Sequence, residues 1–114
     1  MFPKSERLKK KKDFDKVFHE GNSFKEDFLF LKTFKNNLEI NRFGVAVGKK
    51  TFNKATERNR IKRIINELLR SELPQLKKGW DIIVIVGGDI KDKSFGELRG
   101  KINKLFEKAK LILN

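Results

Sequence analysis

The segment Trp80–Val86 constrains the fold of this chain more than any other part of the sequence. It follows a glycine and ends in five consecutive Ile and Val residues. β-Branched residues favour extended backbone, and an apolar run without alternation is typical of a strand that is buried on both faces. We therefore expect this segment to be a central strand of a sheet, ended by the two glycines that follow it.

A second constraint is the strongly basic stretch Lys49–Arg70, which carries eight Lys or Arg residues against two Glu. Its apolar residues recur at spacings of three and four, so they share one face of a helix. Those residues are Ile61, Ile64, Ile65, Leu68 and Leu69. We expect a loop up to Lys54, a cap at Asn53 or Thr56, and a helix that ends near residues 71–74.

The opposite side of this predicted helix is cationic and carries amides. At about 100° per residue, the stripe consists of Asn59, Arg63, Asn66 and Arg70, with Arg60 and Lys62 beside it and Arg58 near the apolar edge. A charged helix face is usually no more than a solvated surface. A solvated face normally mixes both signs, however, and here Glu67 can neutralise only a neighbour such as Arg63 or Arg70. The pattern therefore favours a surface for a polyanion.

The first predicted helix runs up to Glu20 and ends at Gly21. Phe14, Val17 and Phe18 lie on one side of it, and the ordinary explanation for such rings is a buried core. Lys10 nevertheless precedes Phe14 by one helical turn on the same side. A lysine in line with an aromatic ring can hold a phosphate and a stacked base. The sequence leaves both explanations open.

The remaining elements follow from alternation, turn residues and capping signals. Residues 24–35 have an extended pattern, and Asn36 and Asn37 mark a turn. Residues 42–48 form the next predicted strand, most simply the antiparallel neighbour of the one before. A final helix opens with the capping box Ser94–Glu97. Its apolar stripe consists of Leu98, Ile102, Leu105, Phe106 and Ala109.

The predicted elements follow the order α-β-β-β-α-β-α over a single domain, residues 1–114. This order predicts an α+β fold, a small mixed sheet packed with helices as an α-β sandwich. The basic helix joins two strands as a crossover between parallel neighbours. Most crossovers of this kind are right-handed.

Composition limits the class of partner and the compartment. The formal net charge of +13 favours an anionic partner, either nucleic acid or an anionic membrane. The chain has no cysteine, no visible signal peptide and no apolar run close to the ~20 residues that span a bilayer. We therefore expect a cytoplasmic protein with no membrane partner. Residues 1–12 are also basic, and a phosphate-binding arm and a frayed terminus explain them equally well.

The sequence offers little material for catalysis by the protein itself. His19 is the single histidine, and we expect it at the surface. Any nucleophile–histidine set would have to use His19. The sequence has no cysteine or second histidine to complete a zinc ligand cluster. Asp89 and Asp92 suit a magnesium ion, but two carboxylates in such a loop are more often a turn. These features predict a binding protein without catalytic or metal-binding residues.

The order Arg58-Asn59-Arg60 followed by Lys62-Arg63 resembles the RNR signature of the bacterial ribonuclease P protein subunit. The preceding Gly48-Lys49-Lys50 is similar to that family as well, and so is the opening of the chain. The matching opening residues are Arg7–Lys10, Asp13-Phe14, Val17-Phe18 and Gly21. The resemblance covers nearly the whole chain in the right order.

The resemblance implies an RNA-dependent enzyme. In that family the RNA subunit hydrolyses the phosphodiester bond, with magnesium, to remove the 5′ leader of precursor tRNA. The protein binds both RNAs and requires no protein partner. It also implies a left-handed form of the crossover. Carried onto this chain, the contacts to the catalytic RNA are Lys49, Lys50, Arg58, Asn59, Arg60, Lys62, Arg63 and Arg70. The leader-binding cleft is Lys10, Phe14, Phe18, Leu29 and Leu31.

Three positions depart from the family pattern. The interval between Lys49-Lys50 and Arg58 is one residue longer than usual, and glycine replaces the common serine before Lys49. Where the family often has a tyrosine in the strand, this chain has Leu31, or the position is displaced by one residue. The alternative function is a structural RNA-binding protein such as a ribosomal component. It shares the charge and the sandwich but needs no aromatic cleft. A protein-only nuclease would need the acid–base and metal residues that this sequence lacks.

Overall fold

The computed structural model describes residues 7–8, 10–48, 52–88 and 93–113. Within these ranges the elements follow the predicted order, with a short 3₁₀ turn after the basic helix. They are α1 (Lys11–Glu20), β1 (Asn22–Glu26), β2 (Leu29–Lys35), β3 (Arg42–Val47), α2 (Ala55–Glu72), η2 (Leu73–Gln75), β4 (Trp80–Val86) and α3 (Phe95–Lys108). None of the described helices is long and apolar enough to cross a membrane.

The four strands form one mixed sheet in the order β1-β2-β4-β3. β4 is central, as its apolar run predicted, and pairs antiparallel with β2 and parallel with β3. The prediction that β3 is the antiparallel neighbour of β2 is wrong, because β4 lies between them. If β2 and β3 paired as a hairpin, β4 would lie at an edge of the sheet, although its residues are apolar on both faces. Placing β4 between them buries both of its faces and pairs both of its sides.

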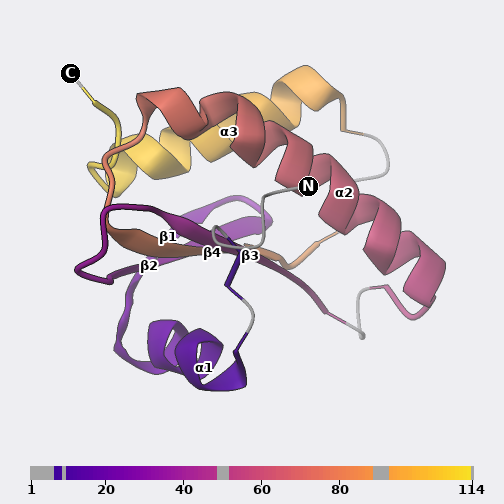
Figure 1. Cartoon of the computed structure of the whole chain (residues 1–114). Helices are drawn as coiled ribbons and strands as arrows, with labels where there is room; N and C mark the ends of the chain where they lie inside the picture. Colours follow the sequence, from indigo (N-terminus) through magenta and orange to yellow (C-terminus); the bar gives the residue numbers. More distant parts are fainter. Residues whose placement is uncertain (1–6, 9, 49–51, 89–92, 114) are drawn as a thin grey trace.

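β3, α2 and β4 form the predicted crossover between parallel neighbours. Val45 pairs with Val84 in the middle of this ladder. α2 and α3 cover one face of the sheet, and α1 covers the other (Figure 1). The sandwich therefore has two apolar layers of different size.

The larger core lies between the sheet and the pair α2 and α3, and eighteen of the described residues are buried in it. The smaller core lies under α1, and three of the described residues are buried in it: Leu8, Val17 and Ile83. Half-buried side chains surround this smaller core: Phe14, Phe18, Phe34, Ala46 and Ile85. α1 is therefore held by far less buried apolar surface than α2 or α3.

The ends of the helices agree in part with the predicted capping. Ser94 Oγ accepts a hydrogen bond from the backbone N–H of Glu97 at 3.1 Å, which confirms it as the N-cap of α3. α2 begins at Ala55, so Thr56 lies inside the helix and Asn53 lies two residues before it. Gly21 ends α1 as predicted, but its φ of −77° is not left-handed. A Cβ there would lie 2.5 Å from the carbonyl oxygen of Val17, so the close approach of the backbone requires glycine.

Candidate nucleic-acid interface

α2 presents the predicted cationic ridge. Ile61, Ile65, Leu68 and Leu69 are buried in the larger core and Ile64 packs against it, which confirms the apolar face. On the other side Asn59, Arg60, Arg63 and Arg70 are exposed, and Lys62 and Asn66 are half-buried. Because apolar packing fixes the helix, these side chains form an ordered row at the surface. We call this set of six residues the α2 ridge.

A shallow hollow interrupts the α2 ridge. Its volume is about 270 Å³, and it is lined by Arg63, Asn66, Glu67 and Arg70. Two guanidinium groups and an amide around one hollow can bind phosphate and sugar oxygens together. One carboxylate among them leaves the surface cationic.

Arg58 differs from the other basic residues of α2. It is half-buried, and its Nη1 donates a hydrogen bond of 2.7 Å to the carbonyl oxygen of Phe52. Phe52 is buried, and its own N–H donates to the carbonyl oxygen of Gly48 at 3.0 Å. Arg58 therefore holds the segment that precedes α2. A substitution of Arg58 would change this segment as well as any RNA contact.

One side of α1 carries an aromatic pair, Phe14 and Phe18. The rings of Phe14 and Phe18 are stacked with centroids 5.6 Å apart and planes 29° apart, and both are half-buried. Val17 between them is fully buried and is the core residue of the helix. The two rings thus lie at the margin of the small core, where one part packs and another part stays accessible.

The position of Phe14 depends on Gly44 in β3. A Cβ at residue 44 would lie 2.6 Å from Cε2 of the Phe14 ring, so a larger residue cannot occupy this position without moving the ring. Glycine within a strand often marks the close approach of another group. The structure shows that an aromatic side chain makes this approach.

Two lysines accompany the aromatic pair. Lys32 Nζ lies 5.6 Å from the centroid of the Phe18 ring and donates a hydrogen bond of 3.1 Å to the Phe18 carbonyl oxygen. Lys10 is exposed, and its carbonyl oxygen accepts the N–H of Phe14 at 3.0 Å, one turn along α1. Lys10 therefore lies one turn before Phe14 along the backbone, its alignment with the ring stays a prediction, and β2 adds a second lysine, Lys32, that the sequence reasoning did not select.

Leu29 and Leu31 were wrong choices for the cleft. Both side chains are 0% exposed and belong to the larger core, under α2 and α3. Successive side chains of a strand point to opposite faces, so an error of one residue in the choice moves the whole set to the other layer. The residues of β2 on the α1 side are Phe30, Lys32 and Phe34.

Phe30 extends the aromatic surface beyond α1. Its ring is half-buried, and Lys25 Nζ from the neighbouring strand lies 5.5 Å from the ring centroid. A Cβ at Gly87 would lie 2.8 Å from Cε2 of this ring, so glycine leaves the space for it. The alternation Phe30, Lys32, Phe34 within β2 was the signal that could have selected these residues. We give the name leader cleft to five residues on this side of the sheet, after the role that the family resemblance implies: Lys10, Phe14, Phe18, Phe30 and Lys32.

The described side chains offer no cluster for a metal ion. No three His, Cys, Asp or Glu residues come together within the described ranges. Asp89 and Asp92 lie outside these ranges, as do Lys49 and Lys50. His19 is exposed, as expected for a residue at the end of α1.

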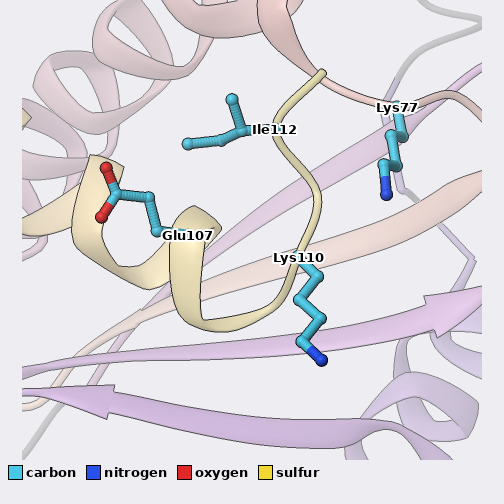
Figure 2. A pocket seen from close by; sticks show the side chains of 4 residues that line it. All are labelled: Lys77, Glu107, Lys110 and Ile112. Atoms are coloured by element: carbon cyan, nitrogen blue, oxygen red, sulfur yellow. The ribbon is translucent and has the colours of Figure 1, made fainter. Parts of the chain in front are cut away.

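Another hollow lies where the C-terminal segment meets the residues after α2. Figure 2 shows its four lining residues, Lys77, Glu107, Lys110 and Ile112, around a volume of about 400 Å³. The backbone N–H of Lys77 donates to the carbonyl oxygen of Leu111 at 2.7 Å, so the segment closes the larger core. Its charges are mixed and it contains no aromatic ring, unlike the leader cleft.

The family model for ribonuclease P matches residues 2–110 of the chain. The chain belongs to the ribonuclease P protein family. The ribonuclease P protein component of Dictyoglomus thermophilum is 39% identical over 110 residues, which cover 95% of this chain and 91% of the relative. That of Clostridium acetobutylicum is 36% identical over 112 residues, which cover 96% and 93%.

Solved structures of ribonuclease P proteins have the same fold. The protein from Staphylococcus aureus superposes with a TM-score of 0.84 at 29% identity, covering 96% of this chain and all of the other. The protein from Thermotoga maritima gives 0.80 at 33% identity, covering 90% and 96%. The left hand of the β3-α2-β4 crossover stays a prediction of the family resemblance. As a family member, the chain is the protein component of a ribonucleoprotein endoribonuclease of tRNA processing.

Proposed function

We propose that this ribonuclease P protein binds its two RNAs through separate surfaces. The α2 ridge, with Arg58, Lys49 and Lys50, binds the catalytic RNA. The leader cleft binds the single-stranded 5′ leader of precursor tRNA. The observation that carries the proposal is the half-buried ring pair of Phe14 and Phe18 with Lys32 beside it. A basic RNA-binding sandwich that held only structured RNA would not need this pair.

The α2 ridge suits a folded RNA. Its charge is positive over successive helical turns, and its amides from Asn59 and Asn66 can donate to and accept from sugar and base edges. Binding that neutralises phosphates releases counterions and is therefore sensitive to salt. Such contacts position the protein without reading sequence.

The leader cleft suits an unpaired strand. Base stacking on aromatic rings is tolerant of sequence, because every base has a π-face. Lysines between the rings can pair with the phosphates that join the stacked bases. Ala46 of β3 packs against the small core under α1, and β3 leads from there towards the start of α2, so one RNA complex can contact both surfaces.

In this proposal the chemistry belongs to the RNA subunit. Magnesium supplies Lewis-acid activation of the attacking water and of the leaving group when it is bound, and we expect the RNA to hold it. The side chains of this chain bind and orient the substrate. The cytoplasm, where tRNA precursors are made in a bacterial cell, is the proposed compartment.

The test replaces aromatic rings by leucine, which keeps apolar packing but removes the stacking face. Phe14→Leu and Phe18→Leu are compared with Phe34→Leu, a half-buried ring of the same small core on the other side of α1. Holoenzyme is reconstituted with ribonuclease P RNA, and Kd is measured for precursor with leader and for mature tRNA.

We expect the two cleft variants to weaken precursor binding by about 1 to 3 kcal/mol per lost stack, with mature tRNA binding and assembly unchanged. The control should change neither Kd. Equal weakening of precursor and mature tRNA in the cleft variants would refute the leader cleft and leave a purely structural RNA-binding role.

A further inference from the structure

α1 has a second side, which faces away from the leader cleft. There a hollow of about 280 Å³ lies between the helix and the ends of β2, β3 and β4. Its lining includes Asp13 and Lys16 of α1, Phe34 of β2, Arg42 of β3 and Asp81 of β4. Three strands and the helix therefore meet at a group of charged side chains.

Asp81 is the fixed point of this group. Its side chain is 4% exposed, and both carboxylate oxygens are bonded to Arg42, with Nε to Oδ1 at 2.8 Å and Nη2 to Oδ2 at 2.7 Å. Asn36 Nδ2 donates a further bond of 2.9 Å to Oδ1. A bidentate pair with a buried carboxylate holds a guanidinium in one orientation. Arg42 is therefore part of the sheet rather than a mobile surface cation.

The remaining nitrogen of Arg42 reaches α1. Its Nη1 lies 3.4 Å from Oδ2 of Asp13, and the two side chains are 23% and 29% exposed. Asp13 directly precedes Phe14. Two residues along β3, Gly44 lies directly beneath the Phe14 ring, where a Cβ would be 2.6 Å from the ring.

These contacts join two successive residues of α1, Asp13 and Phe14, to one face of β3. Arg42 holds the side chain of Asp13, and Gly44 leaves the space for the ring of the next residue, Phe14. Among the described residues, the core under α1 contains three buried apolar side chains, those of Leu8, Val17 and Ile83. Because so little apolar contact holds α1, a single ion pair influences its position more than it would for a helix packed on a large core.

We propose that the bridge Asp13–Arg42–Asp81 is a positioning device that sets α1 over the sheet and so fixes the width of the leader cleft. Asp13 and Arg42 act through the placement of Phe14 and do not contact RNA. This inference rests on the proposed function, because it needs the cleft to bind the leader. Without the bridge the helix can shift, the stacked rings leave their alignment with Lys32, and the preference for precursor over mature tRNA falls.

The experiment compares Asp13→Asn with Asp15→Asn. Both variants remove one negative charge from α1, so both raise the general attraction for RNA equally, but Asp15 is exposed and does not line the hollow. Arg42 is left intact, because its removal would leave Asp81 buried without its cation and would destabilise the whole domain. Asp13→Glu restores a carboxylate on the same side of the helix and serves as the rescue.

The measured quantities are Kd for precursor and for mature tRNA, the cleavage rate at saturating precursor, and the melting temperature of each variant. Partly exposed ion pairs contribute modestly, so we expect Asp13→Asn to lower the ratio of the Kd for mature tRNA to the Kd for precursor by about two- to fivefold. The saturated cleavage rate should stay constant. Asp15→Asn should leave the ratio unchanged, and Asp13→Glu should recover most of it.

Phe14→Leu, measured in parallel, separates this inference from the proposed function. If Phe14→Leu loses precursor preference while Asp13→Asn behaves as Asp15→Asn does, the cleft stands and the positioning device is refuted. If Phe14→Leu also keeps full preference, the leader cleft itself is refuted and the device with it. A loss of preference in Asp13→Asn that follows a large fall in melting temperature and is not recovered by Asp13→Glu would likewise overturn the inference.

Discussion

The substitution Gly44→Ala should disturb the leader cleft without touching any charged residue. The added Cβ would lie 2.6 Å from Cε2 of Phe14 and 3.3 Å from Cζ, and the ring edge must move to relieve the first contact. Residue 44 is buried in a strand paired with β4, so the backbone has little freedom to move instead. Inserting a methyl group into a packed position costs typically about 1 to 3 kcal/mol.

We expect two results from Gly44→Ala. The free energy of unfolding should fall by about 1 to 3 kcal/mol, measured by urea denaturation. The preference of the reconstituted holoenzyme for precursor over mature tRNA should fall as well, because the displaced ring no longer stacks on Phe18. Assembly with the catalytic RNA through the α2 ridge should be unchanged.

A matched control and a double variant test the reasoning. Gly100 lies inside α3 with nothing within 4 Å of an added Cβ, so Gly100→Ala should stabilise the protein by about 0.5 to 1 kcal/mol and leave RNA binding unchanged. In a Phe14→Leu background the clash is absent, and Gly44→Ala should then cost much less. An equal cost of Gly44→Ala in both backgrounds would refute the ring contact as the cause.

Three further predictions concern the ridge, the pH dependence and catalysis. Arg60→Ala and Arg63→Ala should each make the log–log salt dependence of RNA affinity shallower by roughly 0.7 to 0.9, while Lys104→Ala on α3 leaves the slope unchanged; an unaltered slope in both arginine variants would place the RNA contact elsewhere. The pKa values of Glu26 and Asp27 are lowered, chiefly by hydrogen bonds from lysines of α3. Carboxylates with lowered pKa stabilise the fold above their unfolded pKa values, here 4.5 and 3.8. The melting temperature should therefore fall as the pH drops below about that range. A melting temperature that is constant from about pH 5 to about pH 2 would contradict this. The protein freed of RNA should not cleave precursor tRNA with magnesium present, and cleavage that resists ribonuclease treatment and co-elutes with the protein would show that the chain itself catalyses.

Several features of this protein could be predicted because they depend on residues close together in the chain. The apolar face of α2 follows from the spacing of Ile61, Ile65 and Leu68, and the exposed ridge is simply the opposite side of the same helix. The central place of β4 follows from a run that no solvent-facing strand tolerates. The Ser94 cap of α3 is likewise set within four residues. Each of these signals is local, and the tertiary packing is compatible with it.

The faces of β2 show where such local reasoning fails. Alternation divides the strand into Leu29, Leu31 and Thr33 on one side and Phe30, Lys32 and Phe34 on the other. Both sets contain large apolar residues, so composition does not say which set faces α1. That choice depends on which helices cover which face, and the wrong set was selected for the cleft.

Contacts between distant residues were decided by the tertiary structure alone. Arg42 lies 29 residues from Asp13 and 39 from Asp81, and no periodicity connects the three. The pairing of β3 with β4 rather than with β2 likewise depends on which arrangement buries both faces of β4. The sequence by itself thus determined the elements, the cationic helix face and the affinity for a polyanion, because these depend on local spacing and charge. The tertiary structure decided which side chains share a face and meet across the sheet, because that depends on how the layers pack.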